Sequence, residues 1–208
     1  MLNTQRILVL APHTDDGELG CGASIAKYVE QGKEVTYIAF STCSQSLPPD
    51  LPPDTLAREC RNATKALGTS NLILFDFEVR MLLFHRQEIL QELIRLNKEL
   101  QPQTVFMPAE NDIHQDHQVI FAEGMRAFKM SNLLGYELPW NNFKFQPTYF
   151  ESIQQSHLQS KYAALQQYKS QSHRKYMSED FIHSLATVRG IQSNTPLAEA
   201  FEVYHMVG

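Results

Sequence analysis

The chain has 208 residues, of which 43% are hydrophobic, 20% charged and 10% aromatic. This size and composition are typical of one globular domain, and we expect a single domain over residues 1–208. The net charge of −5 provides no overall positive field for nucleic acid or for an anionic membrane surface. The first apolar run, residues 7–11, is far shorter than the ~20 residues that cross a bilayer, so neither a membrane span nor a signal peptide is expected.

The cysteines are three in number, widely spaced, and form no C-x-x-C pair: Cys21, Cys43 and Cys60. This usage favours buried free thiols in a reducing compartment over a disulfide framework. We therefore expect a cytoplasmic protein.

Short apolar runs alternate with helical patterns along the first two thirds of the chain. In chain order we expect a strand at 7–11, a helix at 21–31, a strand at 35–40, a proline-rich loop over the site at 46–54, a helix from 54 or 55 to 67, a strand at 72–77, a helix at 86–100, a strand at 104–107, a helix at 116–129 and a strand at 133–137. An aromatic-rich segment follows at 140–150, then helices at 152–168 and 178–192 and a strand-like end at 200–207.

This alternation of strands and helices predicts an α/β fold, a Rossmann-like and mostly parallel sheet with helices on both faces. In the common strand order 3-2-1-4, the first and fourth strands are neighbours. Ligands then bind outside the carboxyl ends of these two strands.

Two clusters of histidine and aspartate follow those same two strands. Pro12-His13-Thr14-Asp15-Asp16 comes after the first strand, and Asp112-Ile113-His114-Gln115-Asp116-His117 comes after the fourth. With eight histidines and eight aspartates in the chain, either spacing is expected only about 0.01 times by chance. A histidine and an aspartate in one loop are often only a turn or a helix cap, but two such clusters at one crevice indicate a site.

A catalytic zinc ion takes three His or carboxylate ligands and leaves one position for water, and His13, Asp16 and His117 are suitable ligands. Asp15 is the candidate general base for that water, whose pKa falls to ~7 on the metal. His114 is positioned to donate to an oxyanion, and Asp116 to orient an imidazole. Asp112 reads as a cap or turn residue as readily as a functional one. Such ligands admit Zn²⁺, Fe²⁺ or Mn²⁺.

Other common sites lack their sequence signals. Ile25 stands where a G-x-G-x-x-G motif counted from Gly20 needs its third glycine, which disfavours a dinucleotide site. The chain also has no G-x-x-x-x-G-K-[ST] phosphate loop and no G-x-S-x-G nucleophile turn.

The sequence APHTDDGELGCG at 11–22, with DIHQDH at 112–117, resembles the PIG-L and LmbE-like family of zinc-dependent N-acetylglucosaminyl deacetylases. The likeness continues through LARE to ALG at 56–68, the K-x-A-x-L-x-x-Y-x-S-Q pattern at 161–171 and AEAF at 198–201. It therefore covers nearly the whole chain.

The resemblance implies metal ligands at His13, Asp16 and His117 and a general base at Asp15. It also implies that His114 stabilises the oxyanion, with Asp116 behind it. These roles agree with those assigned from the residues alone.

The resemblance extends to the second helix and to quaternary structure. It implies that Arg58 binds substrate, although an exposed helix arginine is an equally simple reading. Some relatives assemble as trimers or hexamers, so a homo-oligomer is a further expectation.

Two positions depart from the commoner motif P-H-P-D-D-E. Thr14 replaces the second proline and Gly17 replaces the glutamate, and Glu18 is a candidate to take over an interaction otherwise made one residue earlier. Neither change affects a ligand or the base.

Several residues keep two readings. Lys161 and the Ser170-Gln171 segment suit a structural role at a helix end as well as contact with substrate. Trp140 and its aromatic neighbours form either a sugar platform or packed core. The neighbours are Tyr136, Phe143, Phe145 and Tyr149.

We therefore expect a metal-dependent hydrolase that removes acetate from an N-acetylated amino sugar, free, nucleotide-linked or glycan-linked, in glycan or glycoconjugate biosynthesis. One alternative keeps the chemistry and changes the substrate to a non-sugar N-acyl compound. Another is a non-catalytic, metal-bearing binding protein on the same scaffold. Only the family resemblance favours a sugar, because the metal chemistry serves any acetamide.

Overall fold

The computed structural model describes residues 4–207. Its core is a seven-stranded sheet in the order β3-β2-β1-β4-β5-β7-β6. The strands are β1 (Arg6–Ala11), β2 (Glu34–Ala39), β3 (Asn71–Leu74), β4 (Thr104–Pro108), β5 (Asn132–Tyr136), β6 (Tyr149–Ser152) and β7 (Ala198–His205). The helices are α1 (Asp16–Glu30), α2 (Thr55–Ala66), α3 (Arg86–Leu100), α4 (Gln115–Ala127), α5 (Gln155–Leu165) and α6 (Glu179–Ser193). Within these described residues, no helix is both long and apolar enough to cross a membrane.

The first five strands of the sheet run parallel, and β7 runs antiparallel to both β5 and β6. This confirms the mostly parallel α/β sheet and the strand order 3-2-1-4. The chain leaves β1 toward β2 on one side, and later returns to β4 on the other side. The carboxyl ends of β1 and β4 therefore flank the crevice that this topology creates.

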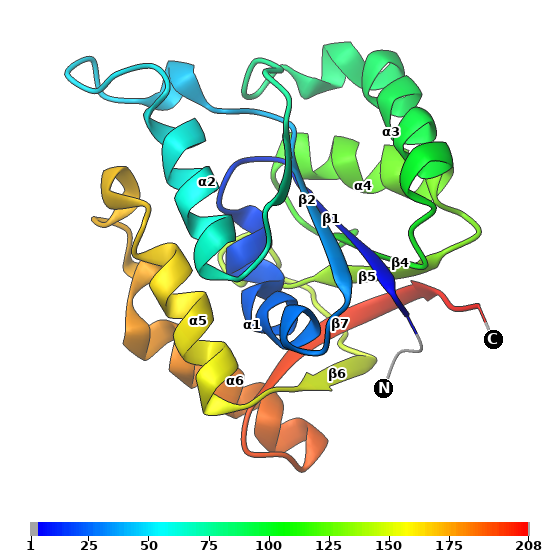
Figure 1. The fold of residues 1–208 in the computed structure, drawn as a ribbon, viewed down its shortest axis with the longest axis vertical. Coiled ribbons are helices and arrows are strands. Elements are labelled where there is room, and N and C mark those ends of the chain that lie inside the picture. Colours follow the sequence, from blue (N-terminus) through cyan, green and yellow to red (C-terminus); the bar gives the residue numbers. More distant parts are fainter. Residues whose placement is uncertain (1–3, 208) are drawn as a thin grey trace.

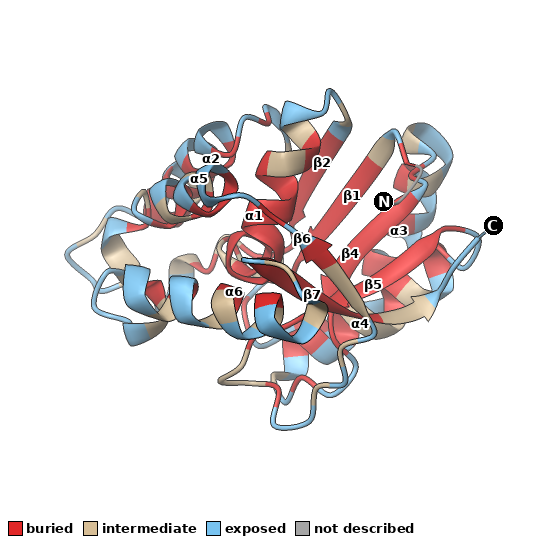
Figure 2. Ribbon diagram, turned by 90° about the horizontal axis from the view of Figure 1, so that it is seen from below, coloured by how far each residue is buried: buried red, intermediate tan, exposed pale blue. Residues whose placement is uncertain are grey.

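Helices cover both faces of the sheet (Figure 1). One face packs against α1, α2, α5 and α6, and the other packs against α3 and α4. Figure 2 shows the central strands β1, β4 and β5 mostly buried between these layers, while the outer helix faces are exposed. The edge strands β3 and β6 are only partly buried. The apolar run of β1 is buried on both faces, as expected for a central parallel strand.

Several element boundaries differ from the sequence expectation, and three of them change the description of the fold. Helix α1 begins at Asp16, directly after the first motif, instead of at residue 21. The predicted helix at 152–168 begins only at Gln155, because residues 149–152 form the edge strand β6. The strand expected at 72–77 ends at Leu74.

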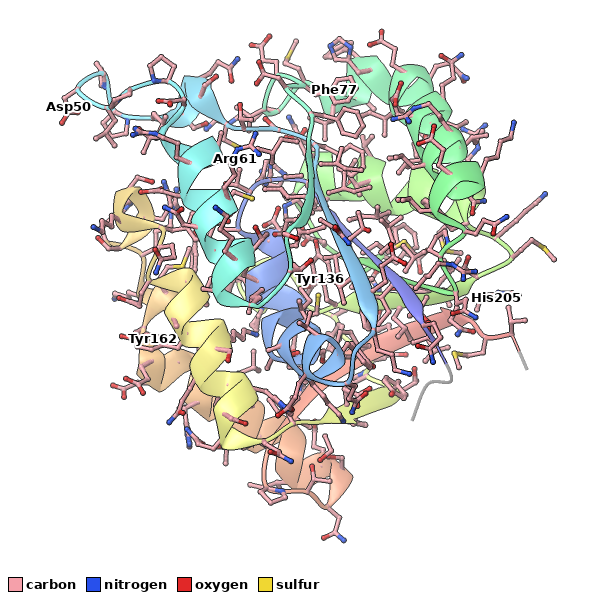
Figure 3. The ribbon with its side chains drawn as sticks, in the orientation of Figure 1. Asp50, Arg61, Phe77, Tyr136, Tyr162 and His205 are labelled. Carbon is pink, nitrogen blue, oxygen red and sulfur yellow. The ribbon has the colours of Figure 1, made fainter. Side chains whose placement is uncertain are left out.

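Glycine allows α1 to approach the sheet closely. A Cβ atom on Gly20 would lie 2.3 Å from the ring of Tyr136, whose hydroxyl donates to the carbonyl of Leu10 at 3.0 Å. Tyr136, labelled at the centre of the molecule in Figure 3, is fully buried. The helix that carries the first motif is thus fixed against β1 and β5.

We expect Gly20→Ala to lower the free energy of unfolding by about 1–3 kcal/mol, because the added methyl group overpacks this contact. Urea denaturation measures the effect. Gly32→Asn is the control, since Gly32 has φ 72° with open space around it and asparagine tolerates that conformation. Helix propensity alone predicts the opposite result for Gly20→Ala, a gain of stability of up to about 1 kcal/mol.

Candidate metal centre and active site

The two sequence motifs meet at the carboxyl edge of β1 and β4. His13 lies in the turn after β1, Asp15 is the N-cap of α1, and Asp16 is its first residue. His114 is the N-cap of α4, and His117 lies in the first turn of that helix. The sheet topology therefore brings together residues that are about a hundred positions apart in the chain.

Three possible ligand atoms form a nearly regular triangle. Asp16 Oδ2 lies 3.1 Å from His13 Nδ1 and 3.2 Å from His117 Nε2, and the two nitrogens are 3.2 Å apart. Ligand atoms bound at 2.0–2.1 Å to a tetrahedral zinc ion are about 3.3 Å from one another. The triangle therefore fits one face of such a site.

The outer nitrogen of each imidazole in the triangle contacts a second carboxylate. His13 Nε2 lies 3.1 Å from Asp116 Oδ2, and His117 Nδ1 lies 2.7 Å from Asp112 Oδ2. Carboxylates in these positions accept the outer N–H, which fixes the tautomer and leaves the inner nitrogen free to bind a metal. The donor set and its supports thus fit a divalent metal ion.

Charge also concentrates at this triangle. Burial alone would lower the pKa of His13, but the Asp16 carboxylate and the Asp116 contact outweigh it and raise the pKa to about 9. Asp16 and Asp112 likewise overcome burial and raise the pKa of His117 to about 10. The two histidines in turn hold the pKa of Asp16 well below its usual range, despite burial. The carboxylates therefore make this site favour positive charge, such as that of a bound metal cation.

His114 lies beside the triangle, and its pKa shifts in the opposite direction from those of His13 and His117. Its ring nitrogen and those of His13 and His117 lie within 4.8 Å of one another, so a three-histidine metal set is also geometrically open. However, His114 Nδ1 accepts the backbone N–H of Asp116 at 3.2 Å, which places the ring proton on Nε2. Burial lowers the pKa of His114 to about 4. A neutral imidazole with an Nε2–H is a hydrogen-bond donor, as an oxyanion requires.

Asp15 is next to the triangle but outside it. Its side chain makes no capping bond to α1, and it lines the cavity that the triangle faces. Burial, together with the negative charge of Asp16, raises the pKa of Asp15 to about 6. A carboxylate of that basicity suits proton transfer near neutral pH.

The cavity has a volume of about 280 Å³. Besides the motif residues and Leu19, its walls come from other parts of the chain. Their lining residues are Cys43, Ser46 and Leu56, then Val79 and Arg80, then Trp140 and Asn141, then Gln171, Arg174 and Tyr176.

Residues 8–128, which contain both motifs, match the family described as PIG-L, GlcNAc-PI de-N-acetylase. The Escherichia coli (strain K12) protein named uncharacterized deacetylase YaiS is 31% identical over 170 residues, which are 79% of this chain and 90% of that protein. The chain belongs to the PIG-L family. Family membership and the deacetylase relative support an enzyme that acts on amides.

Solved structures extend the likeness in fold to the whole chain. N,N'-diacetylchitobiose deacetylase from Pyrococcus horikoshii has a TM-score of 0.80 at 18% identity, over 99% of this chain and 87% of its own. The 4-carboxy-2-hydroxymuconate hydratase GalB from Pseudomonas putida KT2440 also has a TM-score of 0.80, at 20% identity and 98% coverage of both chains. A deacetylase and a hydratase thus share this fold, so the residues of the site must decide the reaction.

Two residues lie elsewhere than the PIG-L resemblance implies. The Asp116 carboxylate contacts the imidazole of His13, as expected of a residue that orients an imidazole, and the backbone N–H of Arg80, but not the His114 ring. The reason is that His114 turns its Nδ1 to the backbone of α4. Arg58 is exposed on α2, pairs with Asp54 at 3.1 Å, and is absent from the cavity lining.

The glycine at position 17, one of the two departures from the commoner PIG-L motif, has a packing explanation. A Cβ atom on Gly17 would lie 2.5 Å from the Tyr37 ring, so the glycine makes room for this tyrosine. Glu18 is fully buried and accepts the hydroxyls of Tyr37 and Tyr168, and burial raises its pKa to about 8. Both tyrosines also donate to the carbonyl of Thr14, and these bonds fix the first motif to the protein core.

The aromatic segment is mostly structural. Of the five aromatic side chains considered for a sugar platform, all of them described, Trp140 is the one that lines the cavity. It stacks on Tyr176 with ring centroids 4.0 Å apart and planes at 11°. Tyr136 is core, and Phe143 is 79% exposed.

The two residues of the Ser170-Gln171 segment have different surroundings. The Ser170 hydroxyl donates to Glu59 on α2 at 2.6 Å, which is a structural contact. Gln171 lines the cavity.

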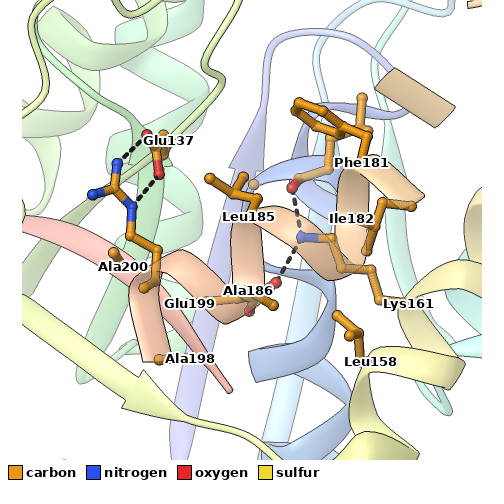
Figure 4. A pocket seen from close by; sticks show the side chains of 13 residues that line it. Glu137, Leu158, Lys161, Phe181, Ile182, Leu185, Ala186, Ala198, Glu199 and Ala200 are labelled. Carbon is orange, nitrogen blue, oxygen red and sulfur yellow. Dashed lines mark hydrogen bonds and ion pairs between the residues drawn. The ribbon is translucent and has the colours of Figure 1, made fainter. Parts of the chain in front are cut away.

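Lys161 supports helix α1 at a break in its backbone. Helix α1 is broken at Cys21, where φ is −144° and ψ is 22°. The buried Lys161 ammonium donates to the Leu19 carbonyl and to Glu199, both at 2.7 Å. Figure 4 shows Lys161 and its contact with Glu199. Glu199 accepts the backbone N–H groups of Ala23 at 3.1 Å and of residue 24 at 2.7 Å. The ion pair therefore caps both helix ends at the break.

Arg80 and Arg174 are cavity residues that the sequence reasoning missed. Each is a single arginine in a loop, with no motif around it. Local sequence offers no signal for either residue, because the fold alone brings them to the cavity.

We expect Asp112→Asn to weaken zinc binding about 10- to 100-fold, because the amide no longer fixes the His117 tautomer. Isothermal titration with Zn²⁺ measures this loss. Asp50→Asn, on an exposed loop tip labelled in Figure 3, is the matched control and should bind zinc normally. Equal affinities for the two variants would remove Asp112 from the metal site.

We expect Lys161→Met to lower the free energy of unfolding by about 3–5 kcal/mol, because it leaves the buried Glu199 carboxylate without its cation. Urea denaturation measures the loss, with Lys65→Met on the exposed face of α2 as the control. A loss below about 1 kcal/mol would show that the ion pair is dispensable for the α1 break.

Proposed function

We propose that the protein is a zinc-dependent N-deacetylase that hydrolyses the acetamide of an N-acetylated amino sugar and releases acetate and the free amine. The observation that carries this proposal is the convergence of the His13, Asp16 and His117 ligand atoms beside Asp15 in one cavity. Membership in the PIG-L family, described as a GlcNAc-PI de-N-acetylase family, and the structural likeness to a diacetylchitobiose deacetylase favour the sugar substrate.

His13, Asp16 and His117 would hold the ion, and Asp116 and Asp112 would keep the two imidazoles in the binding tautomer. Bound zinc supplies Lewis acidity that polarises the acetamide carbonyl and lowers the pKa of the attacking water to about 7. Two nitrogens and one carboxylate oxygen also admit Fe²⁺ or Mn²⁺.

Asp15 accepts a proton from the attacking water at its carboxylate as the new C–O bond forms. The raised pKa of Asp15, about 6, allows the same carboxyl group to return the proton to the nitrogen as the C–N bond breaks. The Nε2–H of His114 donates to the oxyanion between these steps. The amine then leaves with its proton, and acetate remains.

Acetate release by the zinc-loaded protein tests the proposal directly. The panel consists of N-acetylglucosamine, its sugar-nucleotide form, diacetylchitobiose and a non-sugar N-acetyl amine. Acetate from the sugars supports the proposal, and acetate from the non-sugar amide alone reassigns the substrate. Zinc binding without acetate release from any compound would favour a binding protein or a different reaction on this fold.

We expect Asp15→Asn to retain zinc and to lower kcat about 10²- to 10⁴-fold, because the amide cannot accept the proton of water. Metal content and acetate release are measured on the same sample. Asp50→Asn again serves as the control and should keep the wild-type kcat. Full activity in the Asp15→Asn protein would contradict the assignment of the base.

A further inference from the structure

Two guanidinium groups line the metal cavity without a carboxylate partner. Most other arginines of the described chain hold acidic side chains, as Arg86 holds Glu123 and Arg189 holds Glu137. For Arg80 and Arg174, the structure gives only neutral side-chain partners. Their positive charge therefore remains available to a ligand in the cavity.

The backbone fixes Arg80 beside the carboxylate that supports the candidate metal ligand His13. Its φ of 68° is left-handed, a conformation that non-glycine residues seldom adopt. The Arg80 N–H donates to Asp116 at 2.6 Å, and its carbonyl accepts the Gln115 side-chain amide at 2.6 Å. Asp116 itself contacts the imidazole of His13. One carboxylate thus links the position of this arginine to that of a candidate metal ligand.

Side-chain contacts hold Arg174 in place. Its Nε donates to Gln171 at 2.7 Å, and its guanidinium carbon lies 5.8 Å from the Tyr176 ring centroid. Tyr176 in turn stacks on Trp140. Arg174 and Asp15 line the same cavity, so the guanidinium faces the space in which the acetamide would react. An arginine held in this way loses little side-chain freedom when it binds an anion.

Arg174 also lines a second hollow. This open groove, of about 550 Å³, follows the chain from Tyr162 to Glu179 and includes Lys169, His173 and Lys175. Glu179 is the acidic side chain in its lining. The cavity therefore adjoins a surface with a local excess of basic groups, although the whole chain carries a net charge of −5.

We propose that the substrate bears an anionic group, a phosphate ester or a carboxylate, which Arg80 and Arg174 bind while the acetamide reaches the metal triangle. The rest of the substrate extends from Arg174 along the basic groove. A neutral sugar would leave both guanidiniums without a partner, and the acidic chain as a whole offers no other attraction for an anion. This inference rests on the proposed deacetylase activity and specifies its substrate class.

Three probes that share an N-acetylhexosamine ring test the charge requirement. They are methyl N-acetyl-β-glucosaminide, which is neutral, N-acetylglucosamine 1-phosphate and the carboxylate N-acetylmuramic acid. We expect kcat/KM to be at least about tenfold higher for one of the anionic probes, which corresponds to about one charge-assisted hydrogen bond. The better anion identifies the group as phosphate or carboxylate. Equal or higher kcat/KM for the neutral probe would overturn the inference and leave the deacetylase proposal intact.

Variants assign the charge to particular residues. Arg80→Gln and Arg174→Gln should each reduce the anionic-to-neutral ratio of kcat/KM about tenfold. Arg95→Gln, an exposed and ion-paired arginine on α3, is the matched control and should leave the ratio unchanged. A loss of the ratio in Arg58→Gln instead would move the anion site to α2 and contradict the proposal.

A binding measurement keeps the inference testable apart from activity. Trp140 is the one tryptophan of the chain, and it stacks against Tyr176 in the cavity wall. Titration of the zinc-loaded protein with each probe should change its fluorescence at lower concentrations for the preferred anion than for the neutral glycoside. Added salt should weaken the anionic probe only. No acetate from any probe, combined with this charge-dependent binding, would reject the deacetylase activity but retain the anion site.

Discussion

Three acceptor atoms held 3.1–3.2 Å apart at the edge of the sheet are the constraint on which the rest of the site depends. A carboxylate and two imidazole lone pairs repel one another at this distance unless a proton or a cation lies among them. Asp112 and Asp116 add negative charge behind the imidazoles, so they strengthen the demand for a cation. The neighbouring groups then acquire distinct roles, because Asp15 remains basic while His114 stays neutral.

Buried contacts between α1, the sheet and the first motif hold these side chains in place. Tyr136 and Gly20 bring α1 close to the sheet, and Tyr37 and Tyr168 hold the Thr14 carbonyl. The Lys161–Glu199 pair lies at the break in α1, where it completes hydrogen bonds that a continuous helix would make for itself. A buried ion pair within α1 therefore supports the same helix whose first residue, Asp16, belongs to the candidate metal site.

The sequence predicted those features that depend on local pattern. The apolar run of β1, the helix at 86–100 and the strand order follow from periodicity and from the alternation of elements. Strand β6 was missed because its four residues form an edge whose partner, β7, lies about fifty positions later. The early start of α1 was missed because its glycines disfavour a helix in isolation, and only packing in the folded chain explains them: Gly17 lies against Tyr37 and Gly20 against Tyr136.

The candidate site likewise contains some features that the sequence predicts and others that only the fold determines. The motif residues are brought together as the sequence implied, but the partner of each imidazole depends on side-chain orientation, so the supports of His13 and His117 could not be assigned beforehand. Arg80 and Arg174 reach the cavity from loops that carry no motif. Arg58, which only the family resemblance suggested, has its own partner on the surface.

The chain shares its fold with both a deacetylase and a hydratase, so the fold does not decide the reaction. The central claim is therefore that His13, Asp16 and His117 bind a metal ion. Anomalous diffraction from zinc-loaded crystals tests it most directly. The account predicts one zinc ion within about 2.0–2.2 Å of His13 Nδ1, Asp16 Oδ2 and His117 Nε2, with His114 unbound and Asp15 close by. An ion held by the three histidines without Asp16, or an ion outside this cavity, would contradict it.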